Sequence, residues 1–384
     1  MITVEENEYY TQVAAGTPAG EMHRRYWYPI GSSVDVTPER VVPIRLLGED
    51  LVLYKTTKGQ FGLVQRRCPH RSLSLQYGWA DDDGIRCAYH GWGFDQTGQC
   101  FVQPYEDTVG EGTFKNRVKI TAYPVQELGG LLWTYLGPLP APELPRWDIL
   151  ERENVDRQIQ WTLLPCNWLQ IAENSLDPVH VEWLHVNQAN VIAERAGLDP
   201  VMPTFKHLKV DFDLFEYGIY KRRLVEGDPE DSTDWTVGHP LLFPGTLAQE
   251  NMFQWRVPVD DTHTLHIIYS VTVGSGATTY KELPYADDDG SLLNQFIVQQ
   301  DFIAWIGQGE IAPRDLELAG RSDRGILMFR QMLREAIEAV AENEDPIGVI
   351  RDPSVNPIYL VHEGPSPHTT RLLGGGVSLS GLPA

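Results

Sequence analysis

Two short motifs that each combine one cysteine with one histidine constrain this chain more than any other feature. Cys68 and His70 form a C-x-H motif. Cys87 and His90 form a C-x-x-H motif after 16 intervening residues. A Cys2His2 zinc site would need the same four residue types, but zinc knuckles usually pair cysteine with cysteine. Loops that each offer one thiolate and one imidazole suit instead a [2Fe–2S] cluster whose two irons take different ligand pairs.

The residues beside these motifs favour the iron–sulfur cluster over zinc. Pro69 stiffens the first loop, and Gly91 and Gly93 flank a tryptophan directly after the second. Small residues let backbone N–H groups approach sulfide, and such hydrogen bonds raise the potential of a cluster. We therefore interpret the two cysteines and two histidines as ligands of a Rieske [2Fe–2S] cluster, which indicates one-electron transfer.

The length and charge of the chain indicate how many domains it can form and which partners it can bind. Its 384 residues suffice for two domains, and its formal net charge is −22. Because nucleic-acid phosphates repel so acidic a surface, we expect no nucleic-acid partner. The same charge keeps the protein soluble and could steer a basic redox partner toward it.

The remaining cysteines and the N-terminal residues indicate the cellular compartment of the protein. Cys100 and Cys166 are too few for a disulfide framework, and we expect them to be small buried residues or inert thiols. The first residues are acidic and lack the apolar core of a signal peptide, and no apolar run is long enough to span a bilayer. These features predict a soluble, cytoplasmic protein without a membrane partner.

Sequence patterning divides the chain into four parts. Residues 1–25 are expected to form a helical leader. Residues 26–140 contain short apolar segments broken by turns, which predicts an antiparallel β domain with the cluster on two of its loops. A proline-rich stretch near the boundary precedes residues 141–373, the expected catalytic domain. The glycine-rich residues 374–384 are expected to form a flexible tail.

The second domain mixes long strands with helices. Residues 252–273 alternate apolar and polar residues on both sides of a Pro-Val-Asp-Asp turn, as in a half-buried β-hairpin. Residues 205–225 also contain long strands. Helices are expected near residues 166–186, 291–309 and 323–342. The chain as a whole is therefore predicted to be an α+β protein.

A second group of metal-ligand residue types lies between residues 174 and 185. His180 and His185 are five residues apart, so on a regular helix they would diverge by about 140°. They converge on one ion if the helix contains a π-type irregularity, a feature that gathers at functional sites. Otherwise one of them is a packed core residue. Asp177, which precedes Pro178, also has the features of a helix start.

Taken together, the two groups resemble the oxygenase (alpha) component of Rieske non-heme iron ring-hydroxylating oxygenases. The C-x-H…C-x-x-H pair is followed by D-x-x-H-x-x-x-x-H, and the segments EENEYYTQVAAGTPAGEMHRRYWYP and QQDFIAWIGQGEIAPRDLELAGRSDRGI are similar to the phthalate 4,5-dioxygenase-like branch. The resemblance spans nearly the whole chain. It implies an N-terminal antiparallel β Rieske domain and a C-terminal catalytic domain with a curved antiparallel sheet flanked by helices, a helix-grip-like arrangement.

The resemblance also implies a mononuclear Fe(II) held by two histidines and one carboxylate, with open positions for O₂. By motif position, the histidines are His180 and His185, and the carboxylate is Asp301. From the residues alone, Glu310 or Asp315 would serve as well as Asp301.

Two further residues have roles implied by the resemblance. Asp177 matches the aspartate that links a cluster histidine of one subunit to an iron histidine of the next, around a head-to-tail trimer or stacked trimers. Such a carboxylate orients both rings. Asn174 lies one helical turn earlier and is either close to the iron or a capping residue.

The implied reaction uses O₂ and electrons from NAD(P)H, delivered by a separate flavin and iron–sulfur reductase with or without a ferredoxin. The substrate would be an aromatic, carboxylated compound that is mono- or dioxygenated, or O-demethylated. No dinucleotide fingerprint is present in this chain, so the pyridine nucleotide would bind to the partner. The alternative is a Rieske electron-transfer protein whose C-terminal domain binds a ligand and has no mononuclear iron.

Substrate contacts are the least constrained part of the prediction. We expect an apolar pocket formed by strands within residues 210–224 and 245–258 and by the helix near 296–306. Five cations are candidates to bind a carboxylate, although a surface position is the more usual role for each: Arg195, Lys206, Lys209, Arg222 and Arg256. Arg256 alternates with aromatic residues expected to point inward, which places it on the opposite face of its strand.

Overall fold

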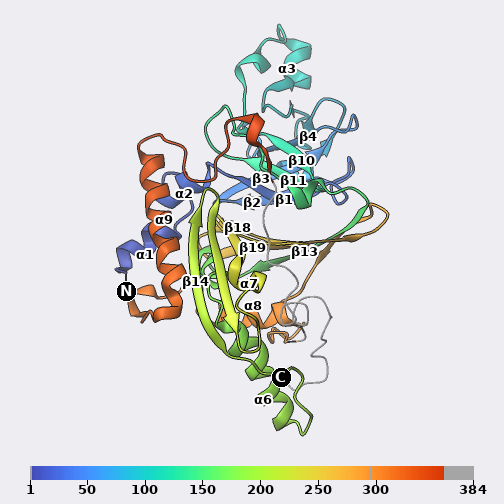
Figure 1. Ribbon diagram of the computed structural model, residues 1–384. Coiled ribbons are helices and arrows are strands. Elements are labelled where there is room, and N and C mark those ends of the chain that lie inside the picture. Colours follow the sequence, from blue (N-terminus) through green and yellow to red (C-terminus); the bar gives the residue numbers. More distant parts are fainter. Residues whose placement is uncertain (1, 295, 359–384) are drawn as a thin grey trace.

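The computed structural model describes residues 2–294 and 296–358. Its N-terminal part is rich in short strands, and its C-terminal part is built on one large, mostly antiparallel sheet with helices packed against it (Figure 1). This arrangement confirms the predicted α+β fold. The expected tail at residues 374–384 lies outside the described residues. In the described ranges, no helix combines the length and the hydrophobicity needed to cross a bilayer.

The first residues form two short helices with well-defined starts. Helix α1 spans Val4–Thr11, and the side chains of Thr3 and Glu6 form a capping box at its N-terminus. Helix α2 spans Pro18–His23, where Thr17 caps the helix and proline occupies the first turn. Both helices belong to the same continuous core as the large sheet, so the leader is packed along the body of the protein.

Two small antiparallel sheets carry the cysteine and histidine motifs. The first contains β2 (Val42–Leu46), β3 (Glu49–Lys55), β4 (Phe61–Gln65) and β9 (Ala122–Tyr123). The second contains β5 (Trp79–Ala80), β6 (Ile85–Arg86), β7 (Gly93–Phe94) and β8 (Cys100–Val102). The loop with Cys68 and His70 follows β4, and the loop with Cys87 and His90 joins β6 to β7. Both loops therefore extend from a small hydrophobic core that the two sheets share and that is separate from the main core.

A third sheet joins this part to the rest of the protein. It contains β1 (Trp27–Ser32), β11 (Leu131–Tyr135) and β10 (Val125–Leu128), in that order. Its buried side chains belong to the same core as the large sheet, and the rings of Trp133 and Trp255 meet edge to face with centroids 5.3 Å apart. The two parts of the chain thus share a packed interface.

The large sheet has eight strands in the order β14-β15-β16-β17-β18-β19-β13-β20. The strands are β13 (Val155–Leu164), β14 (His207–Phe215), β15 (Gly218–Val225), β16 (His239–Leu242), β17 (Thr246–Gln249), β18 (Met252–Asp260), β19 (His263–Val273) and β20 (Thr278–Glu282). All neighbours are antiparallel except β13 and β20. The expected hairpin is present as β18 and β19, in which Arg256 lies opposite His266.

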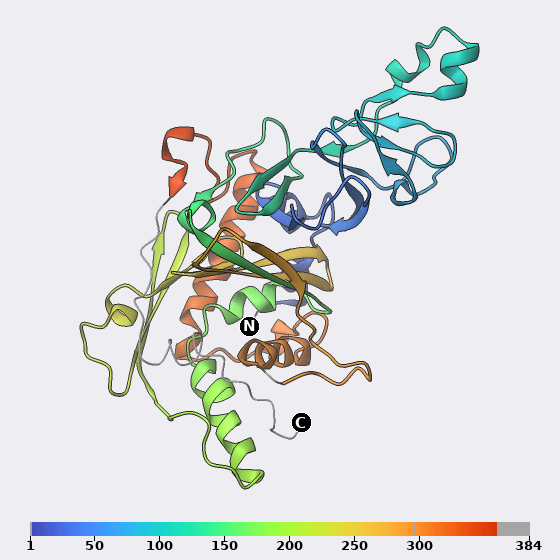
Figure 2. The ribbon, with the colours of Figure 1, turned by 90° about the vertical axis from the view of Figure 1, so that its right-hand side faces the viewer.

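Three helices cover this sheet. Helix α9 (Arg324–Ala341) packs on β14 and β15 with Phe329, Leu333 and Ile337 buried, and it confirms the helix predicted near residues 323–342. Helix α5 (Trp168–Asn174) packs against β18. Helix α8 (Ile297–Gly307) lies beneath the sheet in Figure 2.

The coverage by α5 and α8 corrects one expectation. The hairpin of β18 and β19 was expected to expose one face, but both faces of β18 are largely buried. Arg256 is only 3% exposed although it alternates with Trp255 and Val257. The face of β18 that carries Arg256 therefore points into the protein.

The remaining elements are short. They are α3 (Pro104–Val109), α4 (Asp148–Glu151), α6 (Gln188–Arg195), α7 (Thr233–Thr236), β12 (Arg146–Trp147) and β21 (Pro357–Ile358). Figure 1 places α3 next to the cluster-motif sheets at one end of the molecule and α6 at the other end.

Candidate metal centres and pocket

A π-helix brings His180 and His185 to the same side of the chain. The π-helix η3 spans Val181–Asn187, directly after His180, and leads into α6. In a π-helix the backbone hydrogen bonds join residues five apart, so such residues are neighbours on one face. The two imidazole centroids lie 5.2 Å apart. The irregularity that the five-residue spacing predicted is therefore present.

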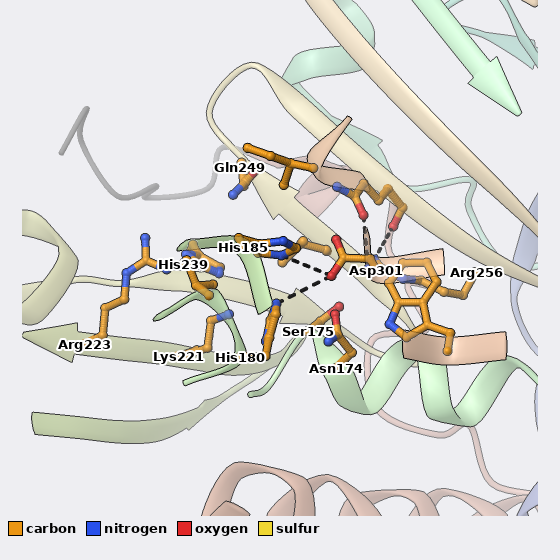
Figure 3. A pocket seen from close by; sticks show the side chains of 15 residues that line it. Asn174, Ser175, His180, His185, Lys221, Arg223, His239, Gln249, Arg256 and Asp301 are labelled. Carbon is orange, nitrogen blue, oxygen red and sulfur yellow. Dashed lines mark hydrogen bonds and ion pairs between the residues drawn. The ribbon is translucent and has the colours of Figure 1, made fainter. Parts of the chain in front are cut away.

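Asp301 on α8 completes a group of three with these histidines (Figure 3). Its Oδ1 lies 3.2 Å from His185 Nε2 and 3.7 Å from His180 Nε2. One ligand atom from each of the three residues lies within 4.8 Å of the others, and no second such group occurs in residues 2–294 and 296–358. The geometry therefore distinguishes Asp301 from Glu310 and Asp315, which the residues alone did not.

The donor atoms of this group fit a divalent iron. Two imidazoles and one carboxylate are the ligand set of non-heme Fe(II) oxygenases. Asp301 Oδ1 is buried and accepts no hydrogen bond in the described part of the chain. Because a buried carboxylate oxygen needs a donor or a cation, this atom is a suitable metal ligand.

Charges within the group are strongly coupled. Burial acts to raise the pKa of Asp301, but the imidazoles of His185 and His180 outweigh it and hold that pKa below its ordinary value. Burial acts to lower the pKa of His185, and the Asp301 carboxylate outweighs it and raises that pKa. A metal ion must therefore compete with a proton on His185, and its affinity should fall as the pH falls.

Gln300, the neighbour of Asp301 on α8, orients His185. Its Oε1 lies 2.9 Å from His185 Nδ1, and both side chains are buried. Since Nε2 of this histidine faces Asp301, we infer that Nδ1 carries the proton and donates it to Gln300 Oε1. This hydrogen bond leaves the Nε2 lone pair directed at the metal position.

The Gln300 contact gives a testable prediction. Gln300→Leu should weaken metal binding roughly 10–100-fold, because the ring loses the acceptor that fixes its orientation. Competition between the protein and a coloured chelator for Fe(II) or Co(II) measures the affinity. Gln300→Glu keeps an acceptor and should bind metal well. Gln299→Leu changes an equally buried glutamine that donates to Pro284 instead, and should leave the affinity unchanged. Equal affinities in all three variants would contradict the role of Gln300.

Asp177 takes the helix-start role that its sequence context allowed, and it also lies beside His180. Its Oδ1 accepts hydrogen bonds from the backbone N–H groups of Val179 and His180, at 2.8 and 3.3 Å. Its Oδ2 lies 3.6 Å from His180 Nδ1. Burial acts to raise the pKa of Asp177, but His180 outweighs it and lowers that pKa. The carboxylate therefore starts the helical turn and also places a negative charge beside one of the candidate iron ligands.

Asn174 lies at the end of α5 and lines the same pocket as the three metal-ligand residues. It does not cap this helix. The N-cap is Asn167, whose Oδ1 accepts a hydrogen bond from Leu169 N at 3.0 Å. Of the two roles left open for Asn174, its position supports the one close to the metal.

The cysteine and histidine motifs bring their two cysteines together and their two histidines together. Cys68 and Cys87 are buried, and burial raises the pKa of the Cys68 thiol to about 11 with Cys87 close beside it. The rings of His70 and His90 are exposed, with centroids 4.4 Å apart. Trp92 stacks on His70 at 4.5 Å with an interplanar angle of 3°. A buried pair of thiols and an exposed pair of imidazoles fit a [2Fe–2S] cluster with its histidine side at the surface.

The two other cysteines are buried and unpaired. Burial raises the pKa of Cys100 to about 11 and that of Cys166 to about 12, so both thiols stay protonated at neutral pH. This agrees with the expected inert thiols.

The pocket beside the three metal-ligand residues includes residues of the expected strands and of the expected helix. It was expected to be apolar, but it also contains several charged side chains. Its apolar members are Val181, Leu247, Ile297 and Trp305. Its polar members, besides the metal group, are Asn174, Ser175, Lys221, Arg223, His239, Gln249, Gln254 and Arg256. In Figure 3, Lys221 and Arg223 lie on one side of the histidines and Arg256 lies on the other.

Of the five cations proposed for substrate binding, Arg256 alone lines this pocket. Arg195 and Lys206 are exposed, Lys209 pairs with Glu230, and Arg222 pairs with Asp213. These four are surface residues, which was their alternative role.

Lys221 and Arg223 were missed by the sequence reasoning. They are two and four residues after Ile219, on the same face of β15 as the buried Ile219 and Val225, and this spacing could have placed them on the inward face. A buried lysine or arginine is rare enough that surface exposure is the usual assumption.

Known proteins with similar sequences support this picture. A family model described as "Rieske [2Fe-2S] domain" matches residues 26–124. The 5,5'-dehydrodivanillate O-demethylase oxygenase subunit of Sphingobium sp. (strain NBRC 103272 / SYK-6) is 43% identical over 374 residues, covering 94% of this chain and 87% of that protein. The phthalate 4,5-dioxygenase oxygenase subunit of Pseudomonas putida is 30% identical over 400 residues, covering 91% and 89%.

Solved structures agree on the fold. NdmA of Pseudomonas putida CBB5, as its QL mutant with caffeine, has a TM-score of 0.61 and 20% sequence identity, covering 85% of this chain and 94% of that one. At this level of identity the likeness concerns the fold alone.

Proposed function

We propose the roles of individual residues from the premise that this chain belongs to the oxygenase components of the Rieske non-heme iron oxygenases. Members of this family contain a Rieske [2Fe–2S] cluster and a mononuclear non-heme iron. In this chain the cluster ligands would be Cys68, His70, Cys87 and His90. The iron ligands would be His180, His185 and Asp301.

The protein is a terminal oxygenase, and we propose that its substrate is an aromatic compound with a carboxylate group. When bound, the two metal centres supply one-electron transfer and O₂ activation. The convergence of two histidines and Asp301 at a pocket is the observation that carries this function. The names of two relatives refer to dehydrodivanillate and phthalate, which are both aromatic acids. One relative is named an O-demethylase and the other a dioxygenase, so both reactions remain candidates.

The residues around the proposed metal position would have three roles: to bind the metal, to orient its ligands and to contact the substrate. His180, His185 and Asp301 all line the pocket, so a metal held by them would be next to a bound substrate. Gln300 orients the His185 ring through Nδ1, and Asp177 places its carboxylate 3.6 Å from Nδ1 of His180. The apolar side chains of Ile297 and Trp305 would contact the aromatic ring.

We propose that electrons cross between subunits of a homotrimer or stacked trimers. The exposed rings of His70 and His90 lie in the part of the chain that forms one end of the molecule, whereas η3 leads into α6 at the other end (Figures 1 and 2). A head-to-tail arrangement would bring the cluster of one subunit to Asp177 of the next. The electron donor would be a flavin and iron–sulfur reductase, with or without a ferredoxin, and the four unpaired cysteines suit a cytoplasmic setting.

Asp177→Asn tests this bridge. The amide oxygen can still accept the two backbone hydrogen bonds, but the variant loses the negative charge beside His180. Both metals should be retained, while oxidation of the reduced cluster by O₂ and substrate slows at least about 10–100-fold. Rapid mixing followed at the visible absorbance of the cluster measures this rate. An unchanged rate with full metal content would refute the role of Asp177.

Metal analysis of anaerobically purified protein tests the proposed function. An oxygenase with both centres should contain about three irons and two acid-labile sulfides per chain, and the reduced protein should give the EPR signal of a histidine-ligated cluster. Consumption of O₂ with aromatic acids, in the presence of a reductase, would then define the reaction. About two irons and two sulfides would favour the electron-transfer alternative.

A further inference from the structure

Arg256 is a buried arginine that forms no ion pair with a carboxylate in residues 2–294 and 296–358. Its side chain is 3% exposed, and its Nη1 and Nη2 donate to the backbone oxygen and Oε1 of Gln254 at 2.9 and 3.1 Å. Its Nε is buried and has no hydrogen-bond partner among the described residues. A guanidinium in such a position loses its hydration without gaining a counter-charge, which costs free energy.

The neighbouring Arg223 differs in this respect. Its Nε and Nη2 both lie 3.3 Å from Oδ2 of Asp234, a residue that is 2% exposed. Among the described residues, the protein therefore pairs one buried arginine of the pocket with a carboxylate and leaves the other without one. The carboxylate of Asp301 acts on Arg256 through its charge, and Asp301 is also the candidate iron ligand.

Arg256 keeps its charge despite its burial. Burial lowers the pKa of this guanidinium to about 9, against the opposing effect of the Asp301 carboxylate. The group is therefore protonated at neutral pH. Next to a bound divalent metal, it adds positive charge to a pocket that already contains Lys221 and Arg223, so the missing partner is an anion.

Gln254 fixes the direction of this arginine. Its Oε1 also lies 3.2 Å from Nε2 of His266, the residue opposite Arg256 on β19. Because one amide oxygen accepts from both side chains, the guanidinium is clamped at its two terminal nitrogens and Nε–H remains unused. This pre-organisation is typical of a binding group rather than of a surface charge.

We propose that Arg256 is the subsite for the carboxylate of the aromatic substrate and that Gln254 is its positioning residue. This inference rests on the proposed function of the pocket. Bound there, the carboxylate would accept the Nε–H hydrogen bond and supply the missing counter-charge. The aromatic ring would then be anchored from the Arg256 side of the metal group.

A stability comparison tests the subsite without any ligand. Arg256→Met removes a charge that has no partner, so the purified full-length protein should unfold at an equal or higher urea concentration than the native protein. Arg223→Met is the matched control, because it removes the guanidinium that lies 3.3 Å from the buried Asp234 carboxylate and should lower the midpoint. An Arg256→Met protein as destabilised as Arg223→Met would overturn the proposal, since Arg256 would then be structural.

A binding comparison tests the ligand class. The probes are 3-methoxybenzoate and 3-methoxybenzamide, which have similar shapes but differ in charge, measured by calorimetry on the metal-loaded protein. The native protein should bind the acid at least about tenfold more tightly than the amide. Arg256→Met should abolish this difference, and Arg256→Lys should restore part of it. Equal binding of both probes, binding of neither, or an acid preference that persists in Arg256→Met would each overturn the subsite.

Oxygen consumption separates this inference from the proposed function. Acid binding that depends on Arg256, without O₂ consumption in the presence of a reductase, would support the subsite and contradict the oxygenase role. O₂ consumption with aromatic acids that is equally fast in Arg256→Met would support the oxygenase role and contradict the subsite.

Discussion

Asp301→Ala is expected to abolish oxygenation and to remove the mononuclear iron while leaving the Rieske cluster intact. The carboxylate is the one anionic donor of the candidate iron site, and its Oδ1 faces both histidines at 3.2 and 3.7 Å. Without it, two neutral imidazoles remain, which are a weak site for a divalent ion. Iron should fall from about three to about two per chain with sulfide constant at about two, and turnover should fall below detection.

Glu310→Ala is the matched control for this experiment. Glu310 is another carboxylate of the same sequence segment, but its side chain is exposed and outside the metal group. Its structural contribution comes from the backbone oxygen, which accepts a hydrogen bond from Asn167 and survives the substitution. Glu310→Ala should keep three irons and full activity. Retention of three irons by Asp301→Ala would exclude this carboxylate as the ligand.

Glu173→Ala is expected to have the largest effect on stability. Glu173 lies in α5 directly before Asn174 and is buried between Arg314 and Arg330. It accepts hydrogen bonds from Arg314 Nη2 at 2.9 Å and from Arg330 Nε at 2.6 Å. Removing the carboxylate leaves two buried guanidinium groups without their shared anion, which should lower the free energy of unfolding by about 3–5 kcal/mol.

Urea unfolding measures this loss, and pH gives an independent check. Burial acts to raise the pKa of Glu173, but the two arginines outweigh it and lower that pKa. The stabilisation is therefore complete above the unfolded pKa, about 4.3, and is lost as the pH falls through the lower folded pKa. Glu335→Ala on the exposed face of α9 should change stability by less than about 0.5 kcal/mol. Similar values for both variants would contradict the burial argument.

The local features of the metal centres could be predicted from the sequence. The C-x-H and C-x-x-H motifs are each contained in one loop, so their residues meet once that loop forms. The π-type turn could be predicted because a five-residue spacing cannot place His180 and His185 together on a regular helix. The choice of Asp301 came from resemblance, and the fold brings α8 to the histidines from more than one hundred residues away.

Burial on both faces of a strand could not be predicted. Alternation along β18 identifies one apolar face, and the opposite face is then assumed to meet solvent. Whether α5 and α8 cover that face depends on contacts distant in sequence. The same limit explains why Arg256 was underrated and why Lys221 and Arg223 were overlooked.

The predicted domain boundaries stay a prediction, although the packing bears on them. The side chain of Asn7 in α1 donates to Ala312 and accepts from Arg314, both beyond residue 300. Tyr10 and Trp27 belong to the same core as Trp255. Composition marks where a chain changes character, but it does not report which segments later pack together.

The π-helix has a consequence for how the protein opens. Helices of this kind are rare and irregular, so the seven residues of Val181–Asn187 gain less from their own hydrogen bonds than an α-helix would. A metal ion held by His180, His185 and Asp301 would clamp this segment to α8, so metal-binding free energy also opposes its local unfolding. Amide hydrogen exchange in this segment should therefore report iron occupancy, while α9 exchanges at a rate set by global unfolding.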